Sequence, residues 1–423
     1  MSVANLIHTL QSMAEAETVS ALEEQERKQL LQACDQLKSK LESPIDLTTR
    51  LIFSGHQAMA LRLGVDLKLF DAMAAKANQS TNGLVHIDEL AEEIHAEPLL
   101  IARLLRFLAA MSVMKEVGRN VYTQTPLAAA YVSTSPLSAA LIHSTHFMTV
   151  LSRLPEYFHA TGWKSPSDGL NGPFQFALQT NNHYFEFLSS HPYYQQAFNT
   201  VMGMPFRRRG RDWFEVFPVA ERLAVPNDTD PLIVDIGGNQ GEDLEKFKRR
   251  FPTLPGRCIL QDLPAVIEGI QDLPAGLEAQ SHDFFQPQPV RNAKVYFMRT
   301  VLHDWPDKQA AQILGRVRDA MSQESIVLIS ETILPESGVL LPSVLSDMQM
   351  MGSFASLERT QEQWRALLEK SGLQLVRVWF PEGFDGRSTS LAEQPALLEA
   401  RLQAHTSPSN SGVPGALGAS NHE

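Results

Sequence analysis

The sequence contains little cysteine. Only Cys34 and Cys258 occur among its 423 residues, so we expect neither a disulfide framework nor a thiolate metal site. The chain also has no uninterrupted apolar run of the roughly 20 residues that span a bilayer. Its first residues lack the basic start and the apolar core of a secretory signal. These absences predict a cytoplasmic protein that has no membrane partner.

Positive charge is scarce as well. The chain has 36 Lys and Arg against 48 Asp and Glu, a net charge of −12, whereas sequence-independent nucleic-acid binding needs clustered basic side chains. No grouping of His and acidic residues has the spacing of a metal site, so we expect no metal. With 43% apolar and 20% charged residues over this length, the composition predicts two globular domains and a tail.

Two phosphate-binding motifs, GxGxxG and GK[ST], are also missing. Instead, residues 231–252 predict a buried strand, a glycine-rich turn and an amphipathic helix. In the turn, Gly237, Gly238 and Gly241 let the backbone bend sharply and approach a ligand without interference from a Cβ. The turn indicates a nucleotide-type ligand, and the missing phosphate motifs disfavour a dinucleotide or a triphosphate.

Asp262 supports this interpretation. It lies near the end of the second predicted strand, residues 257–263. At the carboxyl end of that strand, beside the glycine-rich turn, its carboxylate can accept hydrogen bonds from both hydroxyls of a ribose. An adenosine without phosphates is therefore the ligand that fits best.

Strand and helix patterns alternate from residue 218 to residue 395, which predicts an α/β fold with a parallel, doubly wound sheet. Its ligand should lie at the carboxyl ends of the strands. We expect order to fade after Pro395. The predicted strands are Leu232–Ile236, Arg257–Leu260, Val295–Met298, Ser325–Ile329 and Leu373–Trp379.

The N-terminal part predicts helices and a winged helix. Residues 1–43 form one or two amphipathic helices whose leucine stripe needs a partner. A helix-turn-helix at 86–111 and a hairpin at 113–122 complete a winged helix. A transcription factor is the rival interpretation, but the reading helix would offer only Arg103 and Arg106 as cations. We therefore expect no nucleic-acid partner.

The motifs follow one another in a recognisable order. They are Asp235-Ile236-Gly237-Gly238-Asn239-Gln240-Gly241, Gln261-Asp262-Leu263-Pro264, Asp283-Phe284, Arg299 followed by His303-Asp304-Trp305, Glu331 in SETILP and Glu358 in LERT. The series resembles the class I S-adenosylmethionine-dependent O-methyltransferases of the caffeate and fungal polyketide type. The resemblance implies a Rossmann-like methyltransferase domain and an N-terminal winged-helix dimerisation domain. It also implies a homodimer, with S-adenosyl-L-methionine as methyl donor and S-adenosyl-L-homocysteine as product.

The resemblance also assigns residues to roles. His303 would be the general base, an imidazole of near-neutral pKa that takes the proton of a hydroxyl as its oxygen attacks the methyl, with Glu331 and Glu358 orienting it. Cofactor contacts are expected from Asp235, Gly237, Gly238, Gly241, Asp262, Leu263, Asp283, Phe284 and Arg299. The pocket for a small hydroxylated acceptor, aromatic or of polyketide type, is expected to include Phe198, Met202, Asp304, Asp347 and Met351.

The resemblance also suggests five segments. They are dimerisation helices at 1–43, a winged-helix-like domain at 44–130, a helical pocket and connecting region at 131–217, a methyltransferase domain at 218–400 and a disordered tail at 401–423.

Two residues depart from the family pattern. Asn239 replaces the third glycine of the first motif, and Glu242 follows its last glycine. Both changes could alter cofactor affinity. A second enzyme class therefore remains open, a relative that retains S-adenosylmethionine and catalyses a cyclisation or a pericyclic reaction.

Overall fold

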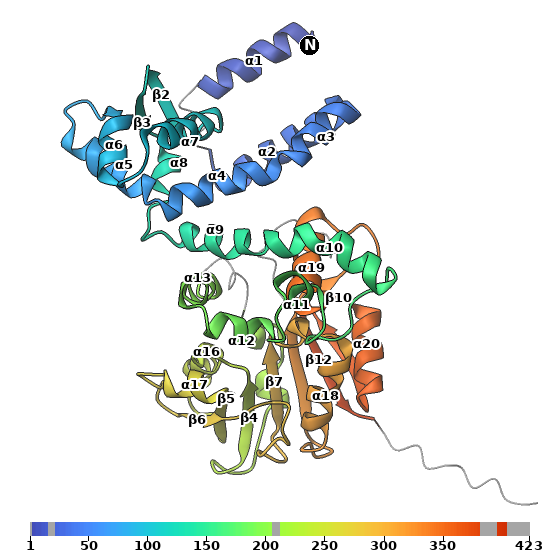
Figure 1. The fold of residues 1–423 in the computed structure, drawn as a ribbon. Coiled ribbons are helices and arrows are strands. Elements are labelled where there is room, and N and C mark those ends of the chain that lie inside the picture. The colour runs from blue at the N-terminus through green and yellow to red at the C-terminus, as the bar shows by residue number, and fades with distance from the viewer. Residues whose placement is uncertain (1, 16–21, 205–211, 381–395, 404–423) are drawn as a thin grey trace, which may run out of the picture. The chain divides into compact units, whose positions relative to one another are not determined.

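A computed structural model describes residues 2–15, 22–204, 212–380 and 396–403 (Figure 1). The chain divides into two compact units, Met1–Leu141 and Ile142–Glu423. The finer division into five segments stays a prediction, and nearly all of the tail predicted at 401–423 lies outside the described residues.

The N-terminal unit consists of helices and one small antiparallel sheet. The predicted helix-turn-helix is confirmed as α6 and α7, and the predicted hairpin as β2 and β3, with β1 added in the order β1-β3-β2. The helices are α1 (Val3–Glu15), α2 (Glu24–Leu41), α3 (Pro44–Ile52), α4 (Ser54–Asp66), α5 (Leu69–Gln79), α6 (Ile87–Glu93), α7 (Pro98–Ala110), α8 (Pro126–Ala129) and α9 (Pro136–His146), which runs into the second unit. The strands are β1 (Val85–His86), β2 (Met114–Gly118) and β3 (Val121–Gln124).

Local sequence explains where these helices begin. Ser43 and Asp46 form a capping box that starts α3 at Pro44. Pro98 occupies the first turn of α7, where a missing N–H costs nothing. Helices α2 and α3 bury none of their residues, so the described residues of this unit cover their apolar side chains at most in part.

The second unit contains a seven-stranded sheet in the order β11-β12-β8-β7-β4-β5-β6. Strands β4 to β8 of this sheet are parallel, and β12 is antiparallel to β8 and to β11. The predicted doubly wound α/β sheet is thus confirmed. The strands are β4 (Pro231–Ile236), β5 (Arg257–Asp262), β6 (Leu277–Ser281), β7 (Val295–Arg299), β8 (Ile326–Glu331), β11 (Leu373–Trp379) and β12 (Ala396–Leu402), and the short β9 (Ile333–Leu334) and β10 (Arg359–Thr360) pair separately.

The expectation that order fades after Pro395 is wrong, because β12 begins at the next residue. This strand buries a charged residue, Glu399, whose side chain is 0% exposed and forms an ion pair with Arg222. From the sequence alone, a charged residue such as Glu399 is expected to be exposed. Its partner Arg222 lies 177 positions away in the chain, so local sequence does not reveal the pair. Strand β6 was not predicted either.

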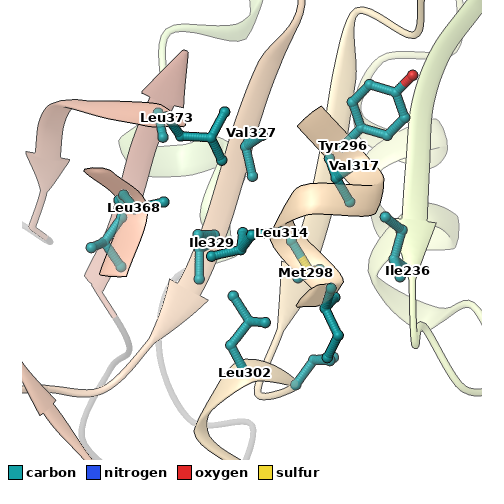
Figure 2. Close-up of a cluster of buried hydrophobic side chains, with 14 of the residues drawn as sticks. Ile236, Tyr296, Met298, Leu302, Leu314, Val317, Val327, Ile329, Leu368 and Leu373 are labelled. Carbon is teal, nitrogen blue, oxygen red and sulfur yellow. The ribbon is translucent and has the colours of Figure 1, made fainter. Parts of the chain in front are cut away.

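Both faces of the sheet are covered. Along β7, Val295 and Phe297 face one cluster of buried side chains, whereas Tyr296 and Met298 face the other. Helices α18 (Asp307–Arg318) and α20 (Gln361–Lys370) cover the second face, and Figure 2 shows Leu314 of α18 beside Met298 and Ile329. The first face is covered by α14 (Trp213–Val216), α15 (Val219–Arg222) and α16 (Glu242–Arg250). Since both faces are buried, the open positions for a ligand lie at the strand ends.

The remaining helices precede, connect and follow these strands. They are α10 (Met148–Thr161), α11 (Pro173–Leu178), α12 (Tyr184–Ser189), α13 (Pro192–Met202), α14 (Trp213–Val216), α15 (Val219–Arg222), α16 (Glu242–Arg250), α17 (Pro264–Glu268), the 3-10 turn η3 (Leu302–Asp304), α18 (Asp307–Arg318), α19 (Leu341–Phe354) and α20 (Gln361–Lys370).

Candidate active site

The glycine-rich turn between β4 and α16 has a left-handed backbone. Gly237 and Gly241 have φ angles of 73° and 80°, and Asn239 has a φ of 52°. A Cβ on Gly238 would lie 2.5 Å from Oδ2 of Asp235. Asparagine tolerates the left-handed region better than most residues, so the turn accommodates Asn239 in place of a third glycine. The turn therefore packs so closely on Asp235 that position 238 has no room for a side chain.

Glu242, the second departure, begins α16. An acidic residue in the first turn of a helix interacts favourably with the helix dipole. This position explains why the family pattern can tolerate a charged residue here.

Asp262 ends β5 beside this turn, as predicted. Its Oδ2 accepts a hydrogen bond from the backbone N–H of Asn239 at 2.9 Å, and its Oδ1 accepts one from that of Leu263 at 2.7 Å. A carboxylate offers about four acceptor positions, so two bonds leave capacity for ribose hydroxyls. Burial raises the pKa of Asp262. Leu263 is 48% exposed, so an apolar side chain lies next to this acid.

Asp235 lies beneath the turn and is 2% exposed. Its Oδ2 has no hydrogen-bond partner among the described residues. Burial, and then the charges of Asp243 and Asp262, raise the pKa of Asp235 well above its ordinary value. Arg299 donates to Oδ1 of Asp243 at 2.6 Å. The unpartnered Oδ2 of Asp235 fits a ligand that brings its own polar or cationic group, because buried polar atoms are normally hydrogen-bonded. The ion pair of Arg299 and Asp243 lies nearby.

Asp283 and Phe284 lie in the loop that follows β6. Oδ1 of Asp283 accepts from the backbone N–H of Phe285 at 3.0 Å, which shapes the loop. The ring of Phe284 lies edge-on to Trp305, with centroids 5.9 Å apart. The predicted adenine-flanking pair thus approaches the loop that carries His303.

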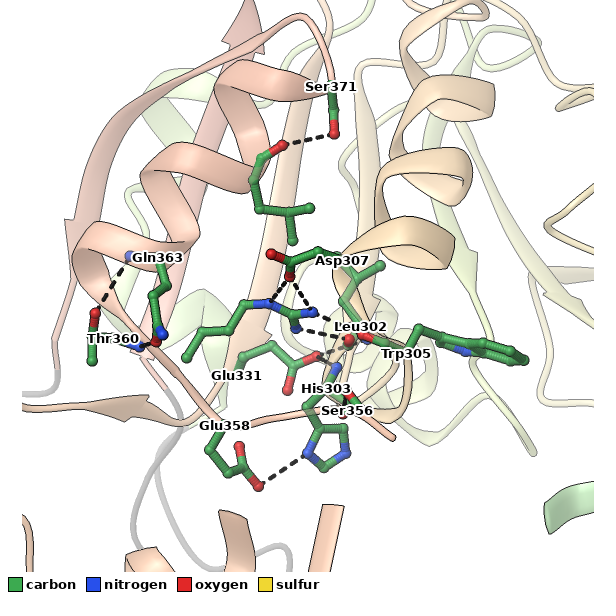
Figure 3. A network of polar contacts seen from close by, with 12 residues as sticks. Leu302, His303, Trp305, Asp307, Glu331, Ser356, Glu358, Thr360, Gln363 and Ser371 are labelled. Carbon is green, nitrogen blue, oxygen red and sulfur yellow. Dashed lines mark hydrogen bonds and ion pairs between the residues drawn. The ribbon is translucent and has the colours of Figure 1, made fainter. Parts of the chain in front are cut away.

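His303 lies on η3, directly beyond β7, and its side chain is 11% exposed. The imidazole Nδ1 lies 3.3 Å from Oε1 of Glu358, and Figure 3 shows this contact. Its Nε2 lies 3.5 Å from Oδ1 of Asp304. Ser346 also donates to Oε1 of Glu358, at 2.9 Å. Glu358 is therefore held in place as the carboxylate that faces the ring.

Glu331 ends β8, as predicted, but its carboxylate binds the backbone of the loop and not the imidazole. Its Oε1 accepts hydrogen bonds from the backbone N–H groups of Val301, Leu302 and His303, at 3.1, 3.0 and 3.3 Å (Figure 3). These N–H groups open a helical turn and have no partner within it. Because Glu331 ends β8 next to β7, it holds the backbone of the loop, and it makes no hydrogen bond to the imidazole.

Arg359 and Ser356 complete the support of this loop and were missed by the sequence reasoning. The side chain of Arg359 is fully buried and donates to the carbonyls of Leu302 at 3.0 Å and Trp305 at 2.7 Å. Ser356 donates to the carbonyl of His303 at 2.5 Å. The sequence offered one signal for Arg359, its place directly after Glu358.

The charges around His303 set its pKa. Burial lowers the pKa of the imidazole, but the carboxylates of Glu331, Asp304 and Glu358 outweigh burial and raise it well above the ordinary value. The expectation of a near-neutral pKa is therefore wrong. Burial would raise the pKa of Glu358, yet the adjacent His303 holds it below its ordinary value. The pair thus favours an imidazolium beside a carboxylate.

The predicted pocket residues lie in different surroundings. Phe198 packs against a cluster of buried aromatic side chains on α10 to α13 and α19, and Asp304 lies beside His303. Asp347 lies on α19 and accepts from the backbone N–H of Glu358 at 2.8 Å, so it supports that residue. Met351 follows one turn later on α19, and Met202 ends α13; both are partly exposed.

Two negative findings apply to the described part of the chain. It contains no group of three or more His, Cys, Asp or Glu residues that could hold a metal ion. Within the same residues, no helix has both the length and the apolar character needed to cross a membrane.

Comparison with protein families gives two matches. A model of the O-methyltransferase domain matches residues 226–374, and a model of the O-methyltransferase dimerisation domain matches residues 49–134. Demethylsterigmatocystin 6-O-methyltransferase of Aspergillus parasiticus is 31% identical over 333 residues, which cover 78% of this chain and 84% of that protein.

Solved structures resemble the whole fold. The complex of LepI with S-adenosylmethionine has a TM-score of 0.76 and 28% identity, covering 95% of this chain and 100% of that one. A structure described as a pericyclic reaction enzyme gives the same TM-score, identity and coverage.

Proposed function

This chain belongs to the family of S-adenosylmethionine-dependent O-methyltransferases, and we propose that it methylates a hydroxyl of a small aromatic or polyketide-type acceptor with His303 as the general base. The matches to the two family models confirm the resemblance that the motifs indicated. The observation that carries the base assignment is the contact of the imidazole Nδ1 with the buried carboxylate of Glu358.

The cofactor supplies an electrophilic methyl on a sulfonium. Asp262 would accept its ribose hydroxyls, since the carboxylate keeps free acceptor positions next to the turn. Gly237 and Gly238 let the turn pack closely on Val301 and Asp235, where a Cβ would lie within 2.9 Å and 2.5 Å of those side chains. Asp283 and Phe284 would flank the adenine.

The base chemistry follows from the acidic surroundings of His303. A phenolic hydroxyl has a pKa of about 10, so His303 in its unprotonated form, which becomes more abundant as the pH rises, can take its proton with little cost. Glu358 then stabilises the imidazolium that forms. Because the sulfonium is reactive in itself, alignment would supply most of the remaining acceleration, and well-oriented reactants gain roughly 7–11 kcal/mol.

The family match also supports a homodimer. The dimerisation model covers residues 49–134, and apolar side chains of α2 and α3 are exposed, among them Leu41 at 74% and Ile45 at 77%. An uncovered apolar stripe of this kind fits a second copy of the chain.

A second candidate reaction comes from one of the structural relatives. The pericyclic reaction enzyme shares the fold over 95% of this chain at 28% identity. The alternative is that this chain retains S-adenosylmethionine and catalyses a cyclisation or pericyclic reaction. The His303–Glu358 contact favours methyl transfer, because a base beside a carboxylate is what deprotonation of a hydroxyl needs.

A product-mass assay separates the two reactions. The wild type, given S-adenosylmethionine and a panel of phenolic and polyketide-type acceptors, should yield products heavier by one methylene and equimolar S-adenosylhomocysteine. His303→Gln should lower this rate by about 10²–10⁴-fold with cofactor affinity unchanged, whereas His159→Gln, an exposed control on α10, should have no effect. Conversion of an acceptor at unchanged mass, without S-adenosylhomocysteine, would favour the cyclase. Loss of cofactor binding in His303→Gln would make His303 structural.

A further inference from the structure

Next to the catalytic loop lies a group of aromatic side chains that the proposed reaction leaves unassigned. Tyr184 and Phe354 are 3% and 4% exposed, with ring centroids 5.1 Å apart. Phe185 and Phe198 are partly buried and lie 5.9 Å from each other. The edge of His143 faces Phe198 at 5.7 Å. We call these five residues the aromatic box.

The aromatic box adjoins the loop of His303 through the ring of His183. The centroid of this ring lies 5.3 Å from that of Phe185 and 5.9 Å from that of Phe354, and the ring stacks on Trp305 at 4.5 Å. Asp304, the residue before Trp305, has its Oδ1 3.5 Å from Nε2 of His303. A flat ring held by the aromatic box would therefore lie close to the proposed base.

Two polar atoms interrupt this apolar surface. The Tyr184 hydroxyl lies 3.5 Å from Nδ1 of His143, which is its one hydrogen bond among the described residues. Buried hydroxyls normally make good hydrogen bonds, because leaving them unsatisfied is costly. A contact of 3.5 Å is at the long limit of hydrogen bonding. The Tyr184 hydroxyl therefore retains capacity for a further partner.

The hydroxyl is also fixed as a donor. Burial, and then the charge of Asp304, raise the pKa of Tyr184 above its ordinary value. The phenol stays protonated at neutral pH and can donate to an oxygen of a ligand.

We propose that Tyr184 and His143 are specificity-determining residues that bind a second oxygen of the acceptor. The inference rests on the proposed methyl transfer and adds the acceptor class: a flat aromatic compound with a hydroxyl or carbonyl close to the hydroxyl that is methylated. Tyr184 donates to that oxygen, and His143 is the neighbouring polar contact. An acceptor with one oxygen would leave the Tyr184 hydroxyl without this hydrogen bond.

The test uses two acceptors of the same ring system, 1-naphthol and 1,8-dihydroxynaphthalene. Binding to the wild type, to Tyr184→Phe and to His143→Leu is measured by calorimetry in the presence of S-adenosylhomocysteine, and methyl transfer is measured separately. Tyr193→Phe is the control, since Tyr193 is 47% exposed. Thermal unfolding establishes whether each variant folds. If Tyr184→Phe does not fold, the test relies on His143→Leu.

We expect the wild type to bind the dihydroxy compound at least fivefold more tightly than 1-naphthol. Tyr184→Phe should remove this preference while leaving the affinity for 1-naphthol unchanged, and His143→Leu should reduce it. The proposal is overturned if the wild type shows no preference, if both variants keep it, or if Tyr184→Phe weakens both acceptors equally. If neither acceptor yields a methylated product, that result counts against the proposed function. The role of Tyr184 and His143 in binding a second oxygen is judged from the binding preference alone.

Discussion

Replacing Glu331 with alanine should destabilise the protein strongly, because the Glu331 carboxylate holds the backbone of the loop that carries His303. The substitution removes the acceptor of three N–H groups, of which those of Val301 and Leu302 are buried and that of His303 is partly buried. Each buried group left unsatisfied costs about 1–3 kcal/mol. The two buried groups alone therefore cost about 2–6 kcal/mol, a large share of the roughly 5–15 kcal/mol of a typical domain.

Glutamine at this position should cost less than half as much. Its side-chain oxygen still accepts the three N–H groups, and the loss is limited to the stronger hydrogen bonding of a charged acceptor. Glu324→Ala is the matched control: Glu324 precedes the same strand, β8, and its side chain is 86% exposed, so its removal should change stability by at most about 0.5 kcal/mol.

Urea unfolding, followed by far-UV circular dichroism and by tryptophan fluorescence, measures these differences. The midpoint should fall steeply for Glu331→Ala, less for Glu331→Gln and not at all for Glu324→Ala. If Glu331→Ala unfolds within 1 kcal/mol of the wild type, the backbone-anchor role is wrong. The carboxylate would then act on the imidazole alone, as the sequence had suggested.

Three further predictions concern the cofactor, the assembly and the base. Asp262→Ala should weaken S-adenosylmethionine binding by at least tenfold in calorimetry, because the ribose hydroxyls lose their acceptor; unchanged affinity would remove Asp262 from the site. Deleting residues 1–43 should give monomers or aggregates in analytical ultracentrifugation, and a truncated chain that sediments as a dimer would contradict this. The kcat/KM of methyl transfer should rise with pH through and beyond neutrality, since an unprotonated His303 is needed and its pKa is raised above 6.5. Glu358→Gln should move the inflection to lower pH, and an unmoved inflection would exclude His303 as the titrating group.

The sequence predicted the fold wherever the pattern was local. The helix at Glu242–Arg250 has charged residues around Leu244 and Phe247, and α16 has these bounds in the structure. Strand β12 could not be predicted in this way. Its central Glu399 is buried and pairs with Arg222, far away in the chain, and a periodicity argument has no access to such a partner.

In the candidate site, too, the sequence predicted positions but not the contacts between residues far apart in the chain. Motif positions identified His303, Glu358 and Asp262, and each lies at the end of a strand or in a loop at the expected edge of the sheet. The role of Glu331 could not be read from its position, because it depends on where the N–H groups of the loop point. Arg359 was missed for a related reason: its side chain acts on carbonyls of residues more than 50 positions away.

The distribution of acidic residues links the two halves of the site. Asp243 and Asp262 raise the pKa of the buried Asp235 beneath the glycine-rich turn, and Glu331, Asp304 and Glu358 act together on His303. In a methyl transfer with general-base catalysis, the positive charge leaves the sulfonium and reappears on the imidazole as the acceptor loses its proton. Both positions of that charge would lie in acidic, largely buried surroundings, where attraction between opposite charges is stronger than in water. The reaction would therefore move a cation between two regions that each stabilise it.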